Sequence, residues 1–470
     1  MMRVVEIDKN ICTGCQECTK VCPAYAIEGN PGEPQTINVE KCVMCGQCVQ
    51  KCKSYVSIVT HGYDAYNKVK KERGIPDCVN EPLFAAHNVT HIGEVKKALA
   101  DPTKVVMASA APAVRTGLAE EFGYKLGTLS NGKMAAAFRA LGFDFIYDVN
   151  FAADLTIMEE GSELIQRVTT GKGKLPMFTS CCPAWVTFME RNYPDLTDHL
   201  SSCKSPQQMQ GAVQKTFGAD VNKLKKKDIF NVSVMPCTCK EYECSREEMN
   251  ASGERDIDVV ITTRELAWLI KDAGIDFKKL PEEDFDSPLG GFTGAAEIFG
   301  VTGGVMEAAL RTVYFKLTGK ESEPIEFKAV RGHDAGIREA SLDINGTTVN
   351  VAIASGMKSA KVLLDEIREG KSKYQFIEIM GCPGGCINGG GQPYVRECFL
   401  PNEDDDIMDT YKEKRAQALY TEDERQTLRQ SHNNPQIIEL YEKFLGEPNS
   451  HKSHELLHTT YAAREGFNEI

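Results

Sequence analysis

Long apolar runs and an excess of positive charge are both missing from this 470-residue chain. No stretch approaches the roughly 18 apolar residues that a helix needs to span a bilayer. The 54 Lys and Arg residues are outnumbered by 67 Asp and Glu residues, and the net charge of −13 argues against nucleic acid or an anionic membrane as the main partner. The start, MMRVVEIDKN, has neither the apolar core nor the cleavage site of a signal peptide. We therefore expect a cytoplasmic protein with no nucleic-acid partner and no membrane partner.

Nucleotide-binding fingerprints are missing as well. No nicotinamide or flavin fingerprint is present, and the glycine-rich segment GCPGGCINGGGQP is not a phosphate loop, because two cysteines interrupt it and no Lys-Ser or Lys-Thr follows. The bland alternative is a turn-rich loop that holds two packed cysteines. We expect the glycines instead to let the backbone approach a bulky inorganic group, with positive φ available where needed at Gly384, Gly385, Gly389, Gly390 and Gly391.

Cysteine is the abundant residue that organises the chain. A length of 470 residues suggests about three domains, and a hydrophobic content of 42% is enough for ordinary cores. In the cytoplasm, 18 cysteines are more typical of metal ligands or redox groups than of disulfides. Eight of them fall within the first 52 residues, which makes the N-terminal segment the first candidate metal site.

Two runs near the N-terminus repeat the spacing C-x2-C-x2-C-x3-C, and the first is followed by Pro23 whereas the second is followed by Lys53. The repeat matches the bacterial ferredoxin pattern, in which the fourth cysteine of each run crosses to the other [4Fe-4S] cluster. On that rule one cluster is bound by Cys12, Cys15, Cys18 and Cys52, and the other by Cys42, Cys45, Cys48 and Cys22. Zinc modules, the alternative, separate two cysteine pairs by a longer loop. Two clusters in tandem favour electron transfer over a purely structural role.

The rest of the chain predicts an α/β body with a helical tail. Residues 53–93 read as a charged connector, in which His87 and His91 are expected to be surface residues. Beyond them, helical patterns alternate with short apolar runs, which indicates layers with mainly buried strands. From about residue 403 the chain is helical and charged, and it is expected to wrap a larger body. Three histidines there should lie on a solvated or packed face: His451, His454 and His458.

Three apolar runs of this body end at cysteines. Loops at strand ends are where an α/β protein usually assembles a site. The loops carry enough thiolates for a third cubane cluster, from Cys181, Cys182, Cys237, Cys382 and Cys386. Cys181 and Cys182 are adjacent and on a strand would point to opposite faces, so we expect the two sulfurs to have different roles.

The motifs TSCCPAW, MPCTCKEYE and EIMGCPGGCINGGGQP resemble the three signature motifs of [FeFe] hydrogenases. The resemblance continues through FAADLTIMEEGSELIQR, SSCKSPQQ and TGGVMEAALR and covers nearly the whole chain. It implies an α/β, two-lobed H-cluster domain over residues 79–402, with sheets flanked by helices. A small α+β ferredoxin-like domain over residues 1–78 precedes it, and a helical tail resembling the hydrogenase small subunit follows over residues 403–470.

The resemblance also implies a cofactor and its ligands. The [4Fe-4S] part of the H-cluster would be bound by Cys182, Cys237, Cys382 and Cys386, and Cys386 would bridge to a diiron subsite. That subsite carries CO, cyanide and a bridging azadithiolate, and maturation proteins insert it. Lys240 would donate a charge-assisted hydrogen bond to a cyanide, and Met235 and Met380 would pack around the diiron ligands.

A proton relay is implied by the same resemblance. Cys181 would be a proton-transferring thiol, since a thiol pKa near about 8.5 allows exchange near neutral pH. The path would continue through Glu160, Ser201 and Glu163 to Arg167 near the surface. The two glutamates are three residues apart in a helical segment, so one face can present both; without the resemblance, a solvated acidic pair would be the better interpretation.

The implied function is reversible H2 formation by an anaerobic, ferredoxin- or flavodoxin-linked hydrogenase. Three alternatives are an H2 sensor, a catalytic subunit of an NAD-linked complex and a non-catalytic iron-sulfur scaffold. Five further cysteines have no assigned role: Cys78, Cys203, Cys239, Cys244 and Cys398. We expect Cys203, Cys239 and Cys244 to be inert buried residues, the alternative being an influence on oxygen or redox sensitivity.

Overall fold

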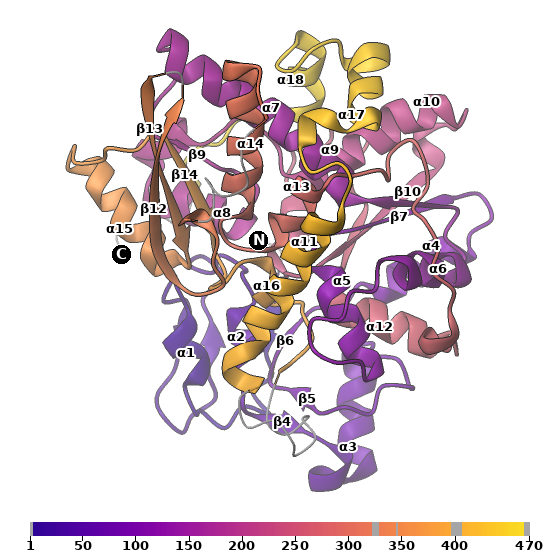
Figure 1. Cartoon of the computed structure of the whole chain (residues 1–470). Coiled ribbons are helices and arrows are strands. Elements are labelled where there is room, and N and C mark those ends of the chain that lie inside the picture. The colour runs from indigo at the N-terminus through magenta and orange to yellow at the C-terminus, as the bar shows by residue number, and fades with distance from the viewer. Residues whose placement is uncertain (1–2, 322–328, 345, 396–406, 465–470) are drawn as a thin grey trace.

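Two four-stranded sheets form the centre of the molecule, in a computed structural model that describes residues 3–321, 329–344, 346–395 and 407–464 (Figure 1). The first sheet has the order β11-β10-β7-β8 and is parallel throughout. Its strands are β7 (Val105–Ala110), β8 (Phe145–Asp148), β10 (Ile229–Met235) and β11 (Val259–Thr262). These strands are almost continuously apolar and buried, as expected for a parallel sheet whose two faces are covered by helices.

The second sheet has the order β12-β13-β14-β9. Its strands are β9 (Met177–Phe178), β12 (Gly336–Ile344), β13 (Thr347–Ser355) and β14 (Phe376–Met380). The β12–β13 pair is antiparallel, and the other pairs are parallel. β12 lies at the edge and alternates between more and less exposed residues, which is typical of a strand with one solvated face. The predicted α/β architecture with buried strands is confirmed.

A long buried helix, α7 (Val149–Thr170), lies between the sheets and contacts α9 (Pro206–Val213) and α14 (Gly304–Thr318) (Figure 1). It begins where the Asp148 side chain accepts a hydrogen bond from the Asn150 N–H, and it ends at Gly171 with φ of 68°. The N-cap bond satisfies one orphan donor, and the glycine adopts the left-handed conformation that ends many helices. Glu160 and Glu163 are both buried on this helix.

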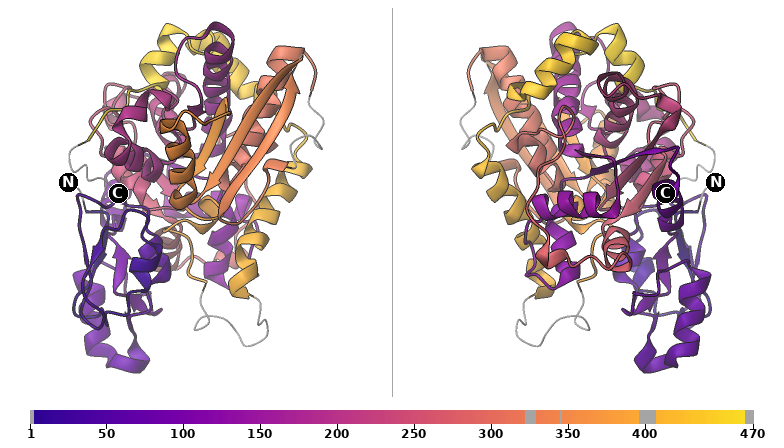
Figure 2. Two further views of the ribbon diagram at one scale, coloured as in Figure 1. Left: turned by 90° about the vertical axis from the view of Figure 1, so that its left-hand side faces the viewer. Right: turned by 90° about the vertical axis from the view of Figure 1, so that its right-hand side faces the viewer.

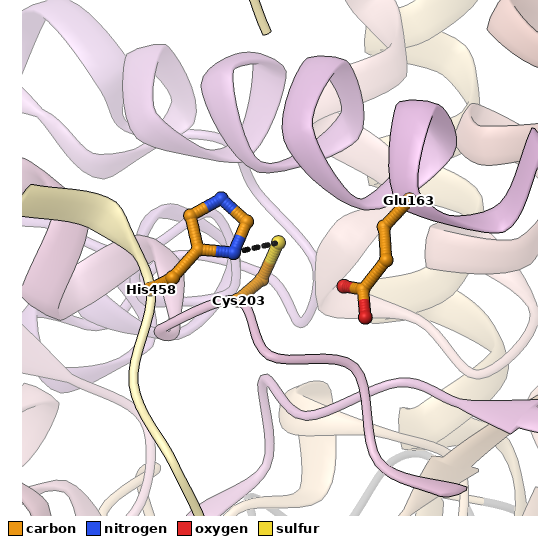
Figure 3. A group of neighbouring side chains, drawn as sticks. All are labelled: Glu163, Cys203 and His458. Atoms are coloured by element: carbon orange, nitrogen blue, oxygen red, sulfur yellow. Dashed lines mark hydrogen bonds between the residues drawn. The ribbon is translucent and has the colours of Figure 1, made fainter. Parts of the chain in front are cut away.

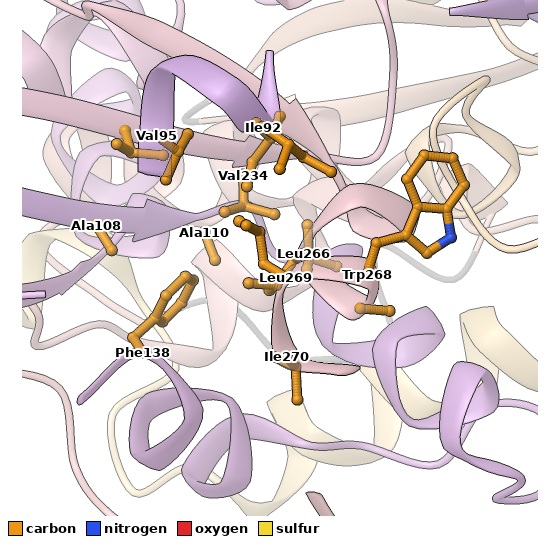
Figure 4. Packing of buried hydrophobic residues seen from close by; sticks show 14 of the residues in the cluster. Ile92, Val95, Ala108, Ala110, Phe138, Val234, Leu266, Trp268, Leu269 and Ile270 are labelled. Atoms are coloured by element: carbon orange, nitrogen blue, oxygen red, sulfur yellow. The ribbon is translucent and has the colours of Figure 1, made fainter. Parts of the chain in front are cut away.

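The core beneath the parallel sheet fixes the strands from one side. Apolar side chains of α4 (Ile92–Ala100), α6 (Asn131–Leu141) and α12 (Thr263–Asp272) pack against β7 and β10 (Figure 4). Phe138 and Leu266 are fully buried there, and a buried aromatic or leucine of this kind typically contributes several kcal/mol. This packing holds the carboxyl ends of the strands, and the loops that follow them, in fixed positions.

The N-terminal unit is built from three two-stranded sheets, two short helices and one longer helix, and lies below the large sheets (Figure 2). The short helices are α1 (Glu17–Val21) and α2 (Gln47–Lys51), each of which follows a cysteine loop, and the longer one is α3 (Ile58–Glu72), within the segment that was predicted as a connector. The sheets pair β1 (Val5–Ile7) with β6 (Ala86–Asn88), β2 (Ile27–Glu28) with β3 (Thr36–Ile37), and β4 (Tyr55–Val56) with β5 (Leu83–Phe84). Residues 83–88 thus pair with the N-terminal strands, while the domain limits at 78 and 402 stay a prediction.

His87 and His91 are not surface residues. His87 is half-buried in β6, and His91 precedes α4, with its side chain only 16% exposed. The His91 Nε2 atom lies 2.5 Å from Glu241 Oε1, and this contact raises the His91 pKa to about 9. The expectation was wrong because the partner lies 150 residues away, where a local pattern carries no information.

The C-terminal tail lies across the helices of the body, as predicted (Figure 2). It comprises α16 (Ile407–Arg425), α17 (Pro435–Leu440) and α18 (His451–Leu457). α16 contacts α5 (Val114–Gly117) and α13 (Gly294–Glu297), α17 contacts α7, and α18 contacts α9. A buried bidentate pair, Arg311 with Asp423 at 2.9 and 2.8 Å, joins α14 to α16. Among the described helices, none has the length and apolar character that a bilayer crossing requires.

Candidate active site

Loops from both sheets meet at an enclosed cavity of about 80 Å³. Met235 ends β10, Met380 ends β14, and both side chains line the cavity at 2% exposure. The structure thereby brings together the four cysteines predicted as H-cluster ligands, which come from three separate loops: Cys182, Cys237, Cys382 and Cys386. Cys181, Cys239 and Lys240 line the same cavity. Such convergence at the carboxyl ends of strands is where α/β folds place their sites.

Backbone donors face the cysteine sulfurs of the cavity. Cys182 is the N-cap of α8 (Pro183–Asn192), and backbone N–H groups of Trp185 and Gly381 face its sulfur. Cys239 donates an S–H hydrogen bond over 3.6 Å to Cys237, and this bond is the main cause of a lowered Cys237 pKa. A helix N-terminus and aimed N–H groups favour thiolate over thiol. The site is therefore arranged for anionic sulfur ligands.

Burial acts in the opposite direction on the other cavity cysteines. It raises the pKa of Cys182, Cys382 and Cys386, and neighbouring cysteines raise each of them further. Four thiolates are thus stable together only beside a cationic group, and iron is the soft cation that sulfur ligands prefer in this arrangement. The donor set fits the cubane part of an H-cluster.

The glycines of the loop that carries Cys382 and Cys386 do not mainly make room for an inorganic group, contrary to the expectation. Only Gly384 and Gly385, with φ of 89° and 98°, adopt positive φ; Gly389, Gly390 and Gly391 do not. A Cβ at Gly389 would lie 2.1 Å from the Pro236 carbonyl oxygen. These glycines therefore let the third cysteine loop pack against the backbone of neighbouring loops.

The N-terminal cysteines form two groups with the predicted crossover. Burial raises the pKa of Cys18 to about 11, and Cys52, Cys12 and Cys15 raise it further, so the four lie together. The second group surrounds a cavity of about 20 Å³ lined by Cys22, Cys42, Cys45 and Cys48.

Main-chain donors reach the N-terminal sulfurs as well. The N–H groups of Ala26 and Met44 donate to Cys22 and Cys42, each over 3.3 Å. Hydrogen bonds to the sulfurs are one of the factors that set the reduction potential of an iron-sulfur cluster. Both cysteine groups fit [4Fe-4S] clusters.

The second N-terminal group lies directly against the large cavity. Gln47 Nε2 donates to the Asn388 carbonyl over 2.9 Å, and Thr238 Oγ1 donates to the Met44 carbonyl over 2.7 Å. Gly46 and Gly390 meet backbone to backbone, because a Cβ on Gly390 would lie 2.6 Å from Gly46 Cα. The cysteine loop before α2 therefore contacts two cysteine loops of the main body, the one that carries Thr238 and the one that carries Gly390.

Lys240 reaches the cavity wall from α11 (Cys239–Cys244). Its Nζ atom donates to the Cys181 carbonyl over 2.9 Å and to Glu243 Oε2 over 3.0 Å. Burial alone would lower its pKa, but Glu243 and Cys237 outweigh burial and raise it. The structure thus holds an ammonium group beside the cavity, and Glu243 is a partner that the sequence did not indicate.

A buried polar path leads from the cavity along α7. Burial, and then Glu160, raise the pKa of the Cys181 thiol well above its usual value. Ser201 Oγ donates to Glu163 Oε2 over 2.8 Å, and Arg167 holds Glu163 Oε1 with bonds of 3.1 and 2.6 Å. All five residues predicted for the relay therefore lie along one path.

Glu160 is the most unusual carboxyl group on this path. Its side chain is 1% exposed, and its oxygens face the Ser201 hydroxyl and the Ser180 N–H, which favour the ionised form. Burial raises its pKa to about 8, and the nearby Glu163 adds to the shift. The group can therefore gain or lose a proton near neutral pH, as a proton-transfer residue must.

The unassigned cysteines divide by burial. Cys203, Cys239 and Cys244 are buried, as expected, and Cys78 is exposed. Cys398 lies outside the described residues.

The three tail histidines differ in exposure. His458 is buried, which agrees with the predicted packed face, whereas His451 and His454 are exposed. The sequence did not predict that His458 contacts Cys203 and Glu159. The local sequence feature that could have indicated the contact between Glu159 and His458 is the pair of adjacent glutamates, Glu159 and Glu160.

Comparison with known proteins identifies the chain. A family model for the "iron only hydrogenase large subunit, C-terminal domain" matches residues 104–390, a model for the "iron hydrogenase small subunit" matches 409–464, and a "4Fe-4S dicluster domain" matches 4–53. The chain belongs to the iron-only, or [FeFe], hydrogenase family. It therefore combines a 4Fe-4S dicluster domain with an H-cluster domain, and the family consists of oxidoreductases that act on H2.

Three similar proteins illustrate the family. The NADP-reducing hydrogenase subunit HndD of Solidesulfovibrio fructosivorans is 47% identical over 91% of this chain and 74% of its own length. The periplasmic [Fe] hydrogenase large subunit of Nitratidesulfovibrio vulgaris is 47% identical over 84% of this chain and 87% of its own. The solved apo [FeFe]-hydrogenase of Chlamydomonas reinhardtii is 42% identical and superposes with a TM-score of 0.68, covering 80% of this chain and 99% of that one.

Replacing the buried carboxyl group tests its raised pKa. Because folding raises the Glu160 pKa from 4.5 to about 8, the unfolded chain loses this proton first as pH rises. Stability should fall between these two pH values, by up to about 1.4 kcal/mol per pH unit. Glu160→Gln should remove this slope, whereas Glu40→Gln, at an exposed position, should retain it. Thermal midpoints measured from about pH 5 to about pH 9 check this, and equal slopes in all three proteins would contradict it.

Proposed function

We propose that this protein is a ferredoxin-linked [FeFe] hydrogenase that interconverts H2 with protons and electrons. The observation that carries the proposal is the cavity itself, at which the four candidate cluster ligands, the two further thiols of Cys181 and Cys239 and the end of a buried polar path converge. When bound, the H-cluster supplies the metal chemistry at which H2 is formed or split. The protein's own residues bind that cofactor, exclude water, and deliver protons and electrons to it.

Each cavity residue has a proposed role. Cys182, Cys237, Cys382 and Cys386 would hold the cubane, and Cys386 would also bridge to the diiron subsite. Lys240 would donate from its ammonium group to a cyanide ligand, since its Nζ already lies at the cavity wall and is oriented by Glu243. Met235 and Met380 would provide adaptable apolar packing, and maturation proteins would insert the subsite.

Protons would move along the buried path in single steps. Cys181 would hold a proton at Sγ, facing the cavity, and exchange it with the Glu160 carboxyl group. The Ser201 hydroxyl, which donates to Glu163, would continue the path, and Arg167 would keep Glu163 in position. The burial of these residues supports the proposal, because an exposed acidic pair would exchange with water at every position.

Electrons would enter through the N-terminal clusters. Cys15 is exposed, so the cluster that it belongs to lies near solvent, whereas the other group contacts the cavity loops through Gly46 and Thr238. This order supports a linear sequence of electron carriers, from partner to outer cluster, inner cluster and H-cluster, that electrons could follow in either direction. A cytoplasmic ferredoxin or flavodoxin is the proposed partner.

A second candidate is an electron-exchanging subunit of an NADP-linked complex, which the similarity to the NADP-reducing hydrogenase subunit favours. The two candidates differ in the electron donor that the isolated chain accepts. We expect H2 evolution from reduced ferredoxin and none from NADPH alone. Activity restored only by added partner subunits and NADPH would support the complex instead.

Removing the thiol at the cavity tests the proton path. Cys181→Ala should reduce H2 evolution from reduced methyl viologen by at least about 100-fold, because alanine cannot transfer a proton. Cys244→Ala, a buried cysteine away from the cavity, is the matched control and should keep the wild-type rate. Infrared bands of bound CO and cyanide should persist in both variants. Bands with no turnover in the wild type would indicate a sensor, and no bands after maturation would indicate a scaffold.

Adding a methyl group at the contact between the two cysteine loops tests the electron path. Gly390→Ala should slow ferredoxin-driven H2 evolution, because its Cβ would force Gly46 and the Cys45 carbonyl away. The infrared spectrum of the cofactor should remain that of the wild type. Gly93→Ala, which adds the same methyl group in open space, is the control. Equal rates for the two variants would show that this contact is not on the electron path.

A further inference from the structure

A cluster of three different metal-ligand side chains lies at the outer end of the polar path (Figure 3). Glu163 comes from α7, Cys203 from the loop before α9, and His458 from the segment after α18. Their ligand atoms all lie within 4.8 Å of one another, and all three residues are buried. The His458 Nδ1 atom and the Cys203 sulfur are 4.0 Å apart.

The ring of His458 is held in the orientation that a metal ligand needs. Its Nε2 atom lies 3.0 Å from Glu159 Oε2, and Glu159 also accepts hydrogen bonds from the Tyr441 hydroxyl and the Asn449 N–H. A carboxylate acceptor at Nε2 fixes the proton there and leaves the lone pair on Nδ1. This lone pair accepts from the Ser202 hydroxyl over 2.8 Å and lies 4.0 Å from the Cys203 sulfur, so a bound cation would replace the Ser202 hydrogen bond. Carboxylate-histidine pairs of this kind orient the histidine ligands of zinc.

Backbone hydrogen bonds position Cys203 opposite His458, and side-chain hydrogen bonds position Glu163. The Lys204 N–H donates to the Leu457 carbonyl, and the Thr459 N–H donates to the Ser202 carbonyl, each over 2.8 Å. This short pairing sets His458 opposite Cys203. The oxygen Oε1 of Glu163 is bound by Arg167, whereas Oε2 faces Ser201 and Ser202 and is close to the cluster.

An exposed histidine lies next to the cluster. His454 is exposed, and its ring lies against the ring of His458 with centroids 4.3 Å apart. The buried cluster is thus separated from an exposed imidazole by the width of one ring contact.

We propose that Cys203 Sγ, His458 Nδ1 and Glu163 Oε2 form a binding site for a zinc-class divalent cation that stops H2 turnover when occupied. Sulfur, imidazole and carboxylate ligands together suit Zn²⁺ and disfavour Mg²⁺ or Ca²⁺. The Cys203 thiol loses its proton to solvent on binding, so thiolate and carboxylate together balance the charge of the cation. The inhibitory effect rests on the proposed proton path, since the cation takes Glu163 out of it; the binding site itself does not.

Zinc titration of the iron-loaded, mature protein tests both the binding site and its inhibitory effect. We expect a zinc K-edge X-ray absorption spectrum with one sulfur near about 2.3 Å and lighter ligands near about 2.0 Å. We also expect loss of H2 evolution that a chelator reverses. Cys203→Ala and His458→Gln should each raise the inhibiting zinc concentration by about 100-fold or more, relative to each variant's own zinc-free rate. Cys244→Ala, which removes a buried thiol elsewhere, should be inhibited like the wild type.

Several results would overturn the proposal. One is zinc bound without a sulfur ligand, and another is equal inhibition of Cys203→Ala and Cys244→Ala. Sulfur-bound zinc with undiminished turnover would remove the inhibitory role. Iron content and near-ultraviolet circular dichroism verify that each variant is folded, and Cys203→Ser replaces the alanine variant if that one is not. A chain that makes no H2 before zinc is added would contradict the proposed function, while the absorption spectrum would still decide the metal site.

Discussion

Burial of ionisable sulfur and carboxyl groups between two sheets is the constraint on which the rest of the structure depends. Cys382 and Cys386 are buried close together, and Glu160 is buried near the Cys181 thiol of the same cavity. Such groups are tolerated only where a rigid body surrounds them, since an isolated buried charge costs several kcal/mol. The α7 helix, the parallel strands and the tail together provide that body.

Local chemistry explains what the sequence could predict. Cysteine spacing is set by the size of the cluster, so the two N-terminal groups and their crossover follow from a few adjacent residues, and the structure brings those groups together. Glu160 and Glu163 lie three residues apart on one helix, but that spacing alone favoured a solvated acidic pair, and only the resemblance to a known family indicated their role. Apolar strand runs predicted the α/β layers because each pattern is contained within one element.

Contacts between distant segments explain what could not be predicted. His458 and Glu159 are 299 residues apart, and His91 and Glu241 are 150 apart, so no local pattern joins either pair. The role of Gly389 and Gly390 was misjudged for the same reason. Their composition suggested space for an inorganic group, but the space is taken by the backbone of Pro236 and Gly46, which only the folded chain brings there.

The separate directions of the two proposed paths, one for electrons and one for protons, have a consequence for energetics. The inner N-terminal group meets the cavity from one direction, and the path through Glu160 reaches it from another, along α7. An electron added to this enclosed space raises the proton affinity of a nearby buried carboxyl group, and a proton added there makes the next reduction easier. The fold would thus couple reduction to protonation through electrostatics alone, without a moving part.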